Sequence, residues 1–291
     1  MAIVPGMRRF APLALAFPLI APILAAGAAR AGEARCWLDH GAVVVAASFG
    51  DMAGDFILDA SAPTSQLHVT RAEEDGIEAS SARAALVLAG ERVEDLDMTV
   101  ADLDARSAGF VTSINGVIGA DMLRRFVLQI DFAPCRIKLY RRAPPPMTGA
   151  IRLRVRQAAA VPAVAATISD GHQSRAGLFA IDTASAASEV AEATLSRQPP
   201  ADGGPPIRLR ALAVAGRLFE QTPAGVTPRT PAAPQGSIGT AVWSHWRLRL
   251  DLRRGWLELA PRRVLVADVP PDAAIAGVEK PGEDEQEDHH R

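Results

Sequence analysis

The sequence predicts an all-β protein of two similar lobes related by a pseudo-two-fold axis, with a few short helices. Two observations carry this prediction: an internal repeat, and a strand-like alternation of apolar and polar residues within each copy of it. The 291 residues are 48% hydrophobic but only 5% aromatic, so the core must consist mainly of aliphatic side chains and alanine.

The repeat consists of two blocks. Residues 116–139 align without a gap with residues 236–259, at an offset of 120. Upstream, residues 55–67 match residues 177–190, which places Asp59 opposite Asp182. The spacing between the blocks is similar in both halves, so we expect each half to form one lobe.

Within each half, apolar residues alternate with polar ones at the period of a strand with one buried face. The expected strands cover residues 126–132, 137–139, 151–155, 246–252 and 257–259. Pro134 and the pair Arg254-Gly255 supply the chain reversals between them. Short helices are expected directly after each Ile-Gly, over Ala120–Arg125 and Thr240–His245.

The composition divides the chain into five segments. They are a signal peptide at 1–31, an N-terminal lobe at 32–143, a proline-rich linker at 144–150, a C-terminal lobe at 151–267 and a disordered acidic tail at 268–291. Proline-rich stretches at 198–206 and 222–236 predict surface loops. His289 and His290 in the tail lack a third ligand, so we expect no metal site there.

The first residues have the pattern of an export signal. Arg8 and Arg9 precede an apolar run over 10–26, and Ala29-Arg30-Ala31 has the small-x-small form that signal peptidase recognises, which predicts cleavage after Ala31. A membrane anchor is the alternative, but three prolines interrupt a run shorter than the roughly 20 residues of a spanning helix. We therefore expect a periplasmic or secreted protein that does not associate with a membrane after cleavage.

Export from the cytoplasm would allow the two cysteines to form a disulfide. Cys36 and Cys135 are the only cysteines, and an oxidising compartment allows one internal disulfide between them. Two free buried thiols are the alternative.

Charge and motifs exclude several functions. With 31 basic and 33 acidic residues the net charge is -2, which gives no electrostatic basis for binding nucleic acid. The sequence contains no HExxH, CxxC, GxSxG or GxGxxG motif, so we expect neither a metal nor another cofactor.

The repeat instead points to two-carboxylate chemistry. Asp59 and Asp182 each end an apolar stretch, and a pseudo-two-fold axis would bring them together at the lobe interface. Two carboxyl groups held close together share one proton, so one can act as a base toward water while the other donates a proton. The alternative is that each aspartate only caps a turn. A second repeated pair, Asp131 and Asp251, precedes hairpin turns, where a structural role is expected, and the cluster of Trp243, His245 and Trp246 is expected to pack in the core or an interface.

Two short motifs occur in the same order in each half, which makes four in all. They are Ile57-Leu58-Asp59-Ala60-Ser61 with Val117-Ile118-Gly119, and Ala180-Ile181-Asp182-Thr183-Ala184 with Ser237-Ile238-Gly239. In this pattern the sequence resembles the aspartic-protease family, over nearly all of residues 36–262. The resemblance implies an acid-protease-like double barrel and a cleft that accepts an extended peptide or protein. It also implies peptide-bond hydrolysis by Asp59 and Asp182 through a shared water, without a cofactor.

The sequence departs from the family pattern at three positions. Ser61 and Ala184 replace the glycine two residues after each aspartate, and Ala60 replaces the threonine or serine whose hydroxyl bonds across the lobe interface in the family. Thr183 keeps that hydroxyl, so the network between the lobes is expected to be half built. The alternative function is therefore a catalytically impaired, aspartic-protease-like protein that binds peptides or acts as a scaffold. Because one chain carries both lobes, we expect a monomer.

Overall fold

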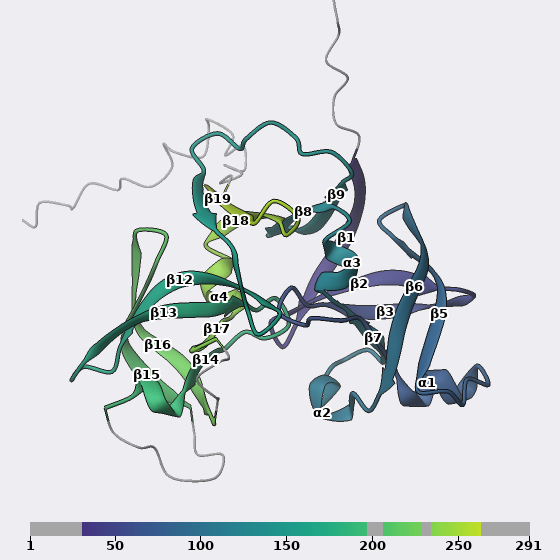
Figure 1. Cartoon of the computed structure of the whole chain (residues 1–291), viewed down its shortest axis with the longest axis horizontal. Coiled ribbons are helices and arrows are strands. Elements are labelled where there is room, and N and C mark those ends of the chain that lie inside the picture. The colour runs from purple at the N-terminus through teal and green to yellow at the C-terminus, as the bar shows by residue number, and fades with distance from the viewer. Residues whose placement is uncertain (1–30, 197–205, 229–233, 263–291) are drawn as a thin grey trace, which may run out of the picture.

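The computed structural model describes residues 31–196, 206–228 and 234–262 (Figure 1). It confirms the all-β, two-lobed prediction: one lobe is built from β1 to β9, the other from β10 to β19, and strands of both form a sheet above them. The predicted signal peptide, the acidic tail and the loop at 198–206 fall wholly or almost wholly outside the described residues. Among the residues described, no helix is long and apolar enough to cross a membrane.

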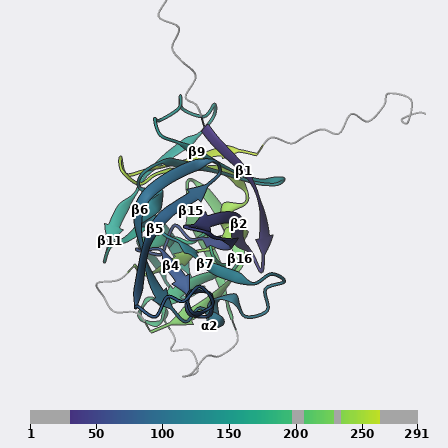
Figure 2. The ribbon, with the colours of Figure 1, turned by 90° about the vertical axis from the view of Figure 1, so that its right-hand side faces the viewer.

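The elements of the first half are β1 (Ala31–Asp39), β2 (Ala42–Phe49), β3 (Met52–Leu58), β4 (Gln66–His68), α1 (Val69–Glu74), β5 (Ser81–Leu88), β6 (Glu91–Ala101), α2 (Asp104–Ser107), β7 (Ile114–Ile118), α3 (Ala120–Leu123), β8 (Val127–Phe132) and β9 (Cys135–Tyr140). Figure 2 faces this lobe and shows β9 and β1 near its top and α2 near its lower end.

The elements of the second half are β10 (Ile151–Arg154), β11 (Arg156–Ala158), β12 (Val161–Ser169), β13 (Ser174–Ile181), β14 (Ser188–Ala191), the 3-10 helix η1 (Glu192–Thr194), β15 (Ile207–Val214), β16 (Arg217–Thr227), β17 (Gly236–Ile238), α4 (Thr240–Trp243), β18 (Trp246–Asp251) and β19 (Trp256–Pro261). The predicted short helices thus form as α3 and α4, each two residues shorter than expected, whereas α1 and α2 were not predicted.

The two lobes have the same strand topology. In the first, the strands run in the order β3-β7-β4-β6-β5, and in the second in the order β13-β17-β14-β16-β15. The strand that leads to each aspartate pairs in parallel with the strand that ends in Ile-Gly, β3 with β7 and β13 with β17. The sequence repeat is therefore also a repeat of the chain path.

A pseudo-two-fold axis passes between β8 and β18, which pair antiparallel. Gln129 lies opposite Arg249, its own partner in the repeat, while Leu128 lies opposite Leu250. The Arg249 guanidinium donates to Gln129 Oε1 at 2.9 Å and to the carbonyl oxygen of Pro145 at 2.6 Å. Residues that the repeat matches thus face each other across this pairing, and Pro145 is tied to the shared sheet beside it.

The Ile-Gly motifs need glycine because another loop passes close behind each. A Cβ on Gly119 would lie 2.6 Å from the Thr64 carbonyl oxygen, and one on Gly239 would lie 2.4 Å from that of Ala187. These close approaches press the loop after each aspartate against the start of α3 or α4. Both glycines therefore support the aspartate loops from behind.

Of the residues expected to have structural roles, Trp243, Trp246 and Asp251 have them, whereas His245 is exposed. Trp243 and Trp246 are buried, and Trp243 Nε1 donates to the Ile238 carbonyl oxygen at 2.5 Å. Asp251 Oδ1 accepts from the Arg254 backbone N–H at 2.9 Å and so closes the turn after β18.

The prediction of a loop over 222–236 is wrong for residues 222–227, which belong to β16, and for Gly236, which begins β17. Pro223 lies opposite Arg208 in β15 and is exposed. It stands two residues after Gln221, whose φ is 50°. A proline is tolerated in a strand beside such an irregularity, where its missing N–H is not required.

The predicted disulfide is present. Cys36 in β1 and Cys135 in β9 are bonded, with their Cα atoms 4.9 Å apart and a sequence separation of 99 residues. The two strands also pair directly at Arg35 and Arg136. The bond therefore closes a loop that contains most of the first lobe, and the free-thiol alternative does not hold.

Replacing both cysteines, Cys36→Ser with Cys135→Ser, should lower the free energy of unfolding by about 2–4 kcal/mol, because the unfolded chain regains the freedom of a long loop. Urea unfolding followed by tryptophan fluorescence measures this change. Wild-type protein under reducing conditions is the matched control and should lose a similar amount. Equal unfolding midpoints for the oxidised wild type and the double variant would contradict the role assigned to the bond.

Candidate active site

The two aspartates occupy equivalent positions, each directly after the strand that leads into it. The Asp59 backbone N–H donates to the Ile118 carbonyl oxygen at 3.0 Å, and that of Asp182 donates to the Ile238 carbonyl oxygen at 3.1 Å. Each carboxylate then accepts from the backbone N–H two residues on: Oδ1 of Asp59 from Ser61 at 2.7 Å, and Oδ1 of Asp182 from Ala184 at 2.8 Å. The aspartates do cap turns, as the alternative proposed, but both also belong to one shared site.

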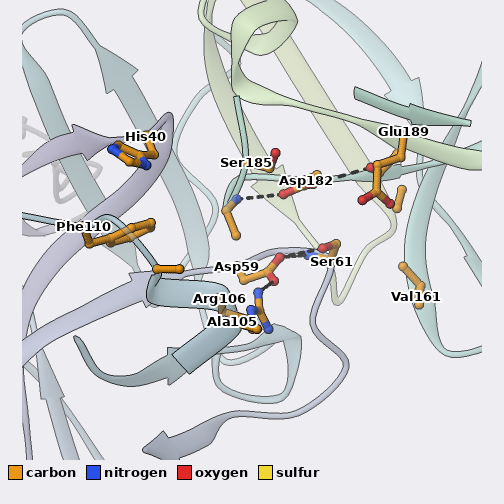
Figure 3. Close-up of a pocket in the computed structure, with 14 residues that line it drawn as sticks. His40, Asp59, Ser61, Ala105, Arg106, Phe110, Val161, Asp182, Ser185 and Glu189 are labelled. Atoms are coloured by element: carbon orange, nitrogen blue, oxygen red, sulfur yellow. Dashed lines mark hydrogen bonds and ion pairs between the residues drawn. The ribbon is translucent and has the colours of Figure 1, made fainter. Parts of the chain in front are cut away.

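That site is a cavity of about 500 Å³ between the lobes, lined by both aspartates (Figure 3). Both lobes also supply the remaining lining residues, which are His40, Ser61, Ala105, Arg106, Ala108, Phe110, Val161, Ala180, Ala184, Ser185, Glu189 and Ser237. The carboxyl groups are almost fully withdrawn from solvent, since Asp59 is 3% and Asp182 9% exposed. Of the other residues predicted for the site, Ser61 and Ala184 line the cavity, whereas Ala60, Thr183, Gly119 and Gly239 lie behind it.

Thr183 joins the two aspartate loops. Its buried hydroxyl donates to the Leu58 carbonyl oxygen at 2.6 Å and accepts from the Ala60 backbone N–H at 3.0 Å. Its own carbonyl oxygen accepts from the Val43 N–H at 2.8 Å. Ala60 has no hydroxyl to make the reciprocal bonds, so the network is half built, as predicted, but the remaining hydroxyl uses both its donor and its acceptor.

A second bridge between the lobes lies beside the first. Thr240 Oγ1 donates to the Gly41 carbonyl oxygen at 2.6 Å. Gly41 has φ +84°, and a Cβ there would lie 2.3 Å from the Ala186 Cβ, so the turn between β1 and β2 requires glycine to reach the second lobe. The aspartate loops are thus held in place by more than the Thr183 hydroxyl.

Ser61 fits the position that a glycine occupies in the family pattern. Its hydroxyl donates to Asp59 Oδ1 at 2.6 Å, in addition to the bond from its backbone N–H. The side chain lines the cavity and does not close it. The extra Cβ therefore adds a hydrogen-bond donor to Asp59.

The environment of Asp182 favours its protonated form. Burial, followed by the negative charge of Asp59, raises the pKa of Asp182 to about 7, and the charge of Glu189 adds to the effect. The Ala184 N–H and the positive charge of Arg106 act in the opposite direction. This is the pattern expected when two carboxyl groups share a poorly hydrated site, because both cannot ionise at low cost.

Arg106, which the sequence reasoning missed, forms an ion pair with Asp59. Its Nη2 contacts Asp59 Oδ2, and its side chain extends from α2 into the cavity. No short motif marks this arginine, and it lies 47 residues from Asp59. In the structure, Arg106 lies in a connection over residues 102–113, and the equivalent connection of the second half covers only 228–235. The sequence shows this difference only as a spacing from aspartate to Ile-Gly that is three residues longer in the first half. Glu189, His40 and Phe110 were also missed.

A metal is not suggested by the described part of the chain, where no group of three or more His, Cys, Asp or Glu residues is placed to hold one.

Comparison with known proteins supports the fold. No family model matches the sequence, and neither does any of the curated proteins compared with it. Among solved structures, the chain is similar to the crystal structure of an aspartic proteinase from Irpex lacteus, with a TM-score of 0.52 and 10% sequence identity. The match covers 82% of this chain and 99% of the proteinase. The fold is therefore that of an aspartic proteinase, while an identity this low says nothing about activity.

Thr183→Val should lower the free energy of unfolding by about 1–3 kcal/mol, because the Leu58 carbonyl and the Ala60 N–H would be left buried without a partner. Thr183→Ser, which keeps the hydroxyl, is the matched control and should lose less. Chemical denaturation of the three proteins provides the comparison. Equal stability of the valine and serine variants would show that the hydroxyl does not hold the loops together.

The raised pKa of Asp182 predicts a pH-dependent stability. The folded protein holds this proton up to about pH 7, whereas the unfolded chain releases it near pH 4. Stability from this group is therefore complete below about pH 4 and is lost as the pH rises to about 7.

Relative to Asp182→Asn, the wild type should lose up to about 4 kcal/mol of unfolding free energy over that range. Urea unfolding at a series of pH values measures the difference. Asp131→Asn, which lies outside the cavity, should follow the wild-type slope. Parallel curves for the wild type and Asp182→Asn would show that Asp182 titrates normally.

Proposed function

We propose that this chain is an exported aspartic endopeptidase in which Asp59 and Asp182 hydrolyse peptide bonds through a shared water. One observation carries the proposal: carboxyl groups from equivalent positions of the two lobes line one cavity, and the charge of one helps to keep the other protonated. Hydrolysis of an amide by two carboxyl groups requires one to be ionised and the other protonated.

The reaction follows from that arrangement. The ionised carboxylate takes a proton from the water as its oxygen bonds to the carbonyl carbon of the peptide, and the protonated carboxyl gives its proton to the carbonyl oxygen. The product is a tetrahedral diol. As it collapses, a proton passes to the amide nitrogen and the C–N bond breaks, which leaves a carboxylic acid and an amine.

The substrate proposed is an extended segment of peptide or protein. A strand-like substrate would lie between the lobes and bring its carbonyl over the aspartates. The disulfide and the leader pattern support function in the periplasm or outside the cell. Because one chain carries both lobes, the proposed state is a monomer.

A second candidate, peptide binding without turnover, is favoured by the crowded surroundings of Asp59. Its Oδ1 already accepts from Ser61 twice, and its Oδ2 is paired with Arg106. If these donors prevent the carboxylate from activating water, the cavity would bind peptides and leave them intact.

Peptide cleavage between pH 3 and 8 tests both candidates. We expect the purified protein to cleave an unfolded protein substrate, and Asp59→Asn and Asp182→Asn each to reduce the rate at least about 100-fold, because each removes a proton-transfer group. Asp131→Asn should retain activity. Undiminished cleavage in either active-site variant would exclude the pair as the catalyst, and peptide binding by an inactive wild type would favour the second candidate.

A further inference from the structure

Arg106 gives the two aspartates different electrostatic surroundings. Its guanidinium is paired with Asp59 Oδ2, whereas Asp182 accepts from two neutral donors, the Ala184 N–H at 2.8 Å and the Ser237 hydroxyl at 3.4 Å. In Figure 3 Arg106 approaches Asp59 from one side and Asp182 lies on the other. The cation therefore reaches Asp59 without standing between the two carboxyl groups in this view.

The segment that carries Arg106 is anchored at several points. The Arg106 backbone N–H donates to the Leu103 carbonyl oxygen at 2.9 Å, and Leu103 itself is fully buried. Further along, the Val111 N–H donates to Asp39 Oδ2 at 2.9 Å. The Phe110 ring packs against His40 with the ring centroids 5.7 Å apart. These contacts attach both sides of α2 to the first lobe, so the position of Arg106 is determined by the fold.

The other charged or titratable groups around the cavity increase this difference. Glu189, on β14, lies on the side of Asp182, and its negative charge favours the protonated form of that group. His40, from the turn between β1 and β2, completes the titratable residues that line the cavity. The arrangement thus places a positive charge at Asp59 and an additional negative charge near Asp182.

We propose that Arg106 is a positioning residue that fixes Asp59 as the carboxylate of the pair, so that Asp59 activates the water and Asp182 supplies the proton. This inference rests on the proposed peptidase function for its mechanistic meaning, but the charge assignment can be tested without a substrate. The repeat makes the two aspartates equivalent in backbone position, and Arg106 makes them chemically different.

Carbon-13 NMR of the aspartate carboxyl groups tests the assignment directly. The Asp59 and Asp182 signals can be identified by their absence from Asp59→Asn and Asp182→Asn. In the wild type between pH 4 and 6, we expect the Asp182 carboxyl signal to show a bound proton and the Asp59 signal to remain that of a carboxylate. A proton found on Asp59 in this range would overturn the proposal, without the need for any Arg106 variant.

Two substitutions of Arg106 then isolate its charge. Arg106→Gln should move a substantial share of the proton from Asp182 to Asp59, while Arg106→Lys, which keeps the positive charge, should preserve the wild-type distribution. The Arg106 side chain is about one-third exposed, and unfolding curves will show whether each variant is folded. An unchanged distribution in folded Arg106→Gln would also overturn the proposal.

The pH profile of kcat/KM supplies an independent readout. Cleavage requires ionised Asp59, so loss of the positive charge should move the acidic limb of the profile to higher pH and reduce kcat/KM at pH 4 about tenfold more than at pH 6. Arg106→Lys should restore the wild-type limb. If the wild type cleaves no peptide, the peptidase proposal fails, while the NMR result still decides the role of Arg106.

Discussion

The hydroxyl of Thr183 connects the two halves at the loops that carry the aspartates. It bonds to the carbonyl of Leu58 and to the N–H of Ala60, the residues on either side of Asp59, while Thr183 itself directly follows Asp182. One side chain therefore ties both aspartates to a common frame. This connection helps to hold the two buried carboxyl groups beside the same cavity, where each can influence the charge of the other.

One hydroxyl is enough to join the aspartate loops because other contacts also hold the two lobes together. The pairing of β8 with β18 aligns the halves on their axis, and Thr240 binds the turn at Gly41 beside the aspartate loops. Ala60 can therefore lack the reciprocal hydroxyl without leaving Thr183 incompletely bonded. Ser61 shows the same tolerance, since its larger side chain serves as a donor to Asp59.

The parts of the structure that follow from symmetry were predictable from the sequence. The match between Asp59 and Asp182, and between Gly119 and Gly239, was enough to predict two lobes and to place both aspartates in one cavity. Features that belong to one half were not predictable in this way. Arg106 lies in a connection that the other half shortens, and Pro223 is accommodated in β16 by an irregularity that composition does not show.

The features found in only one half of the chain have a chemical consequence. An exact repeat would bring together two identical carboxyl groups, whereas acid-base hydrolysis requires one proton donor and one acceptor at the same moment. Two like groups can divide these roles by sharing a proton, and neither is then assigned a role in advance. In this chain the longer connection before β7 places a guanidinium beside Asp59, while Glu189 adds negative charge near Asp182. The symmetric part of the fold thus builds the pair, and the asymmetric part gives its two members different chemistry.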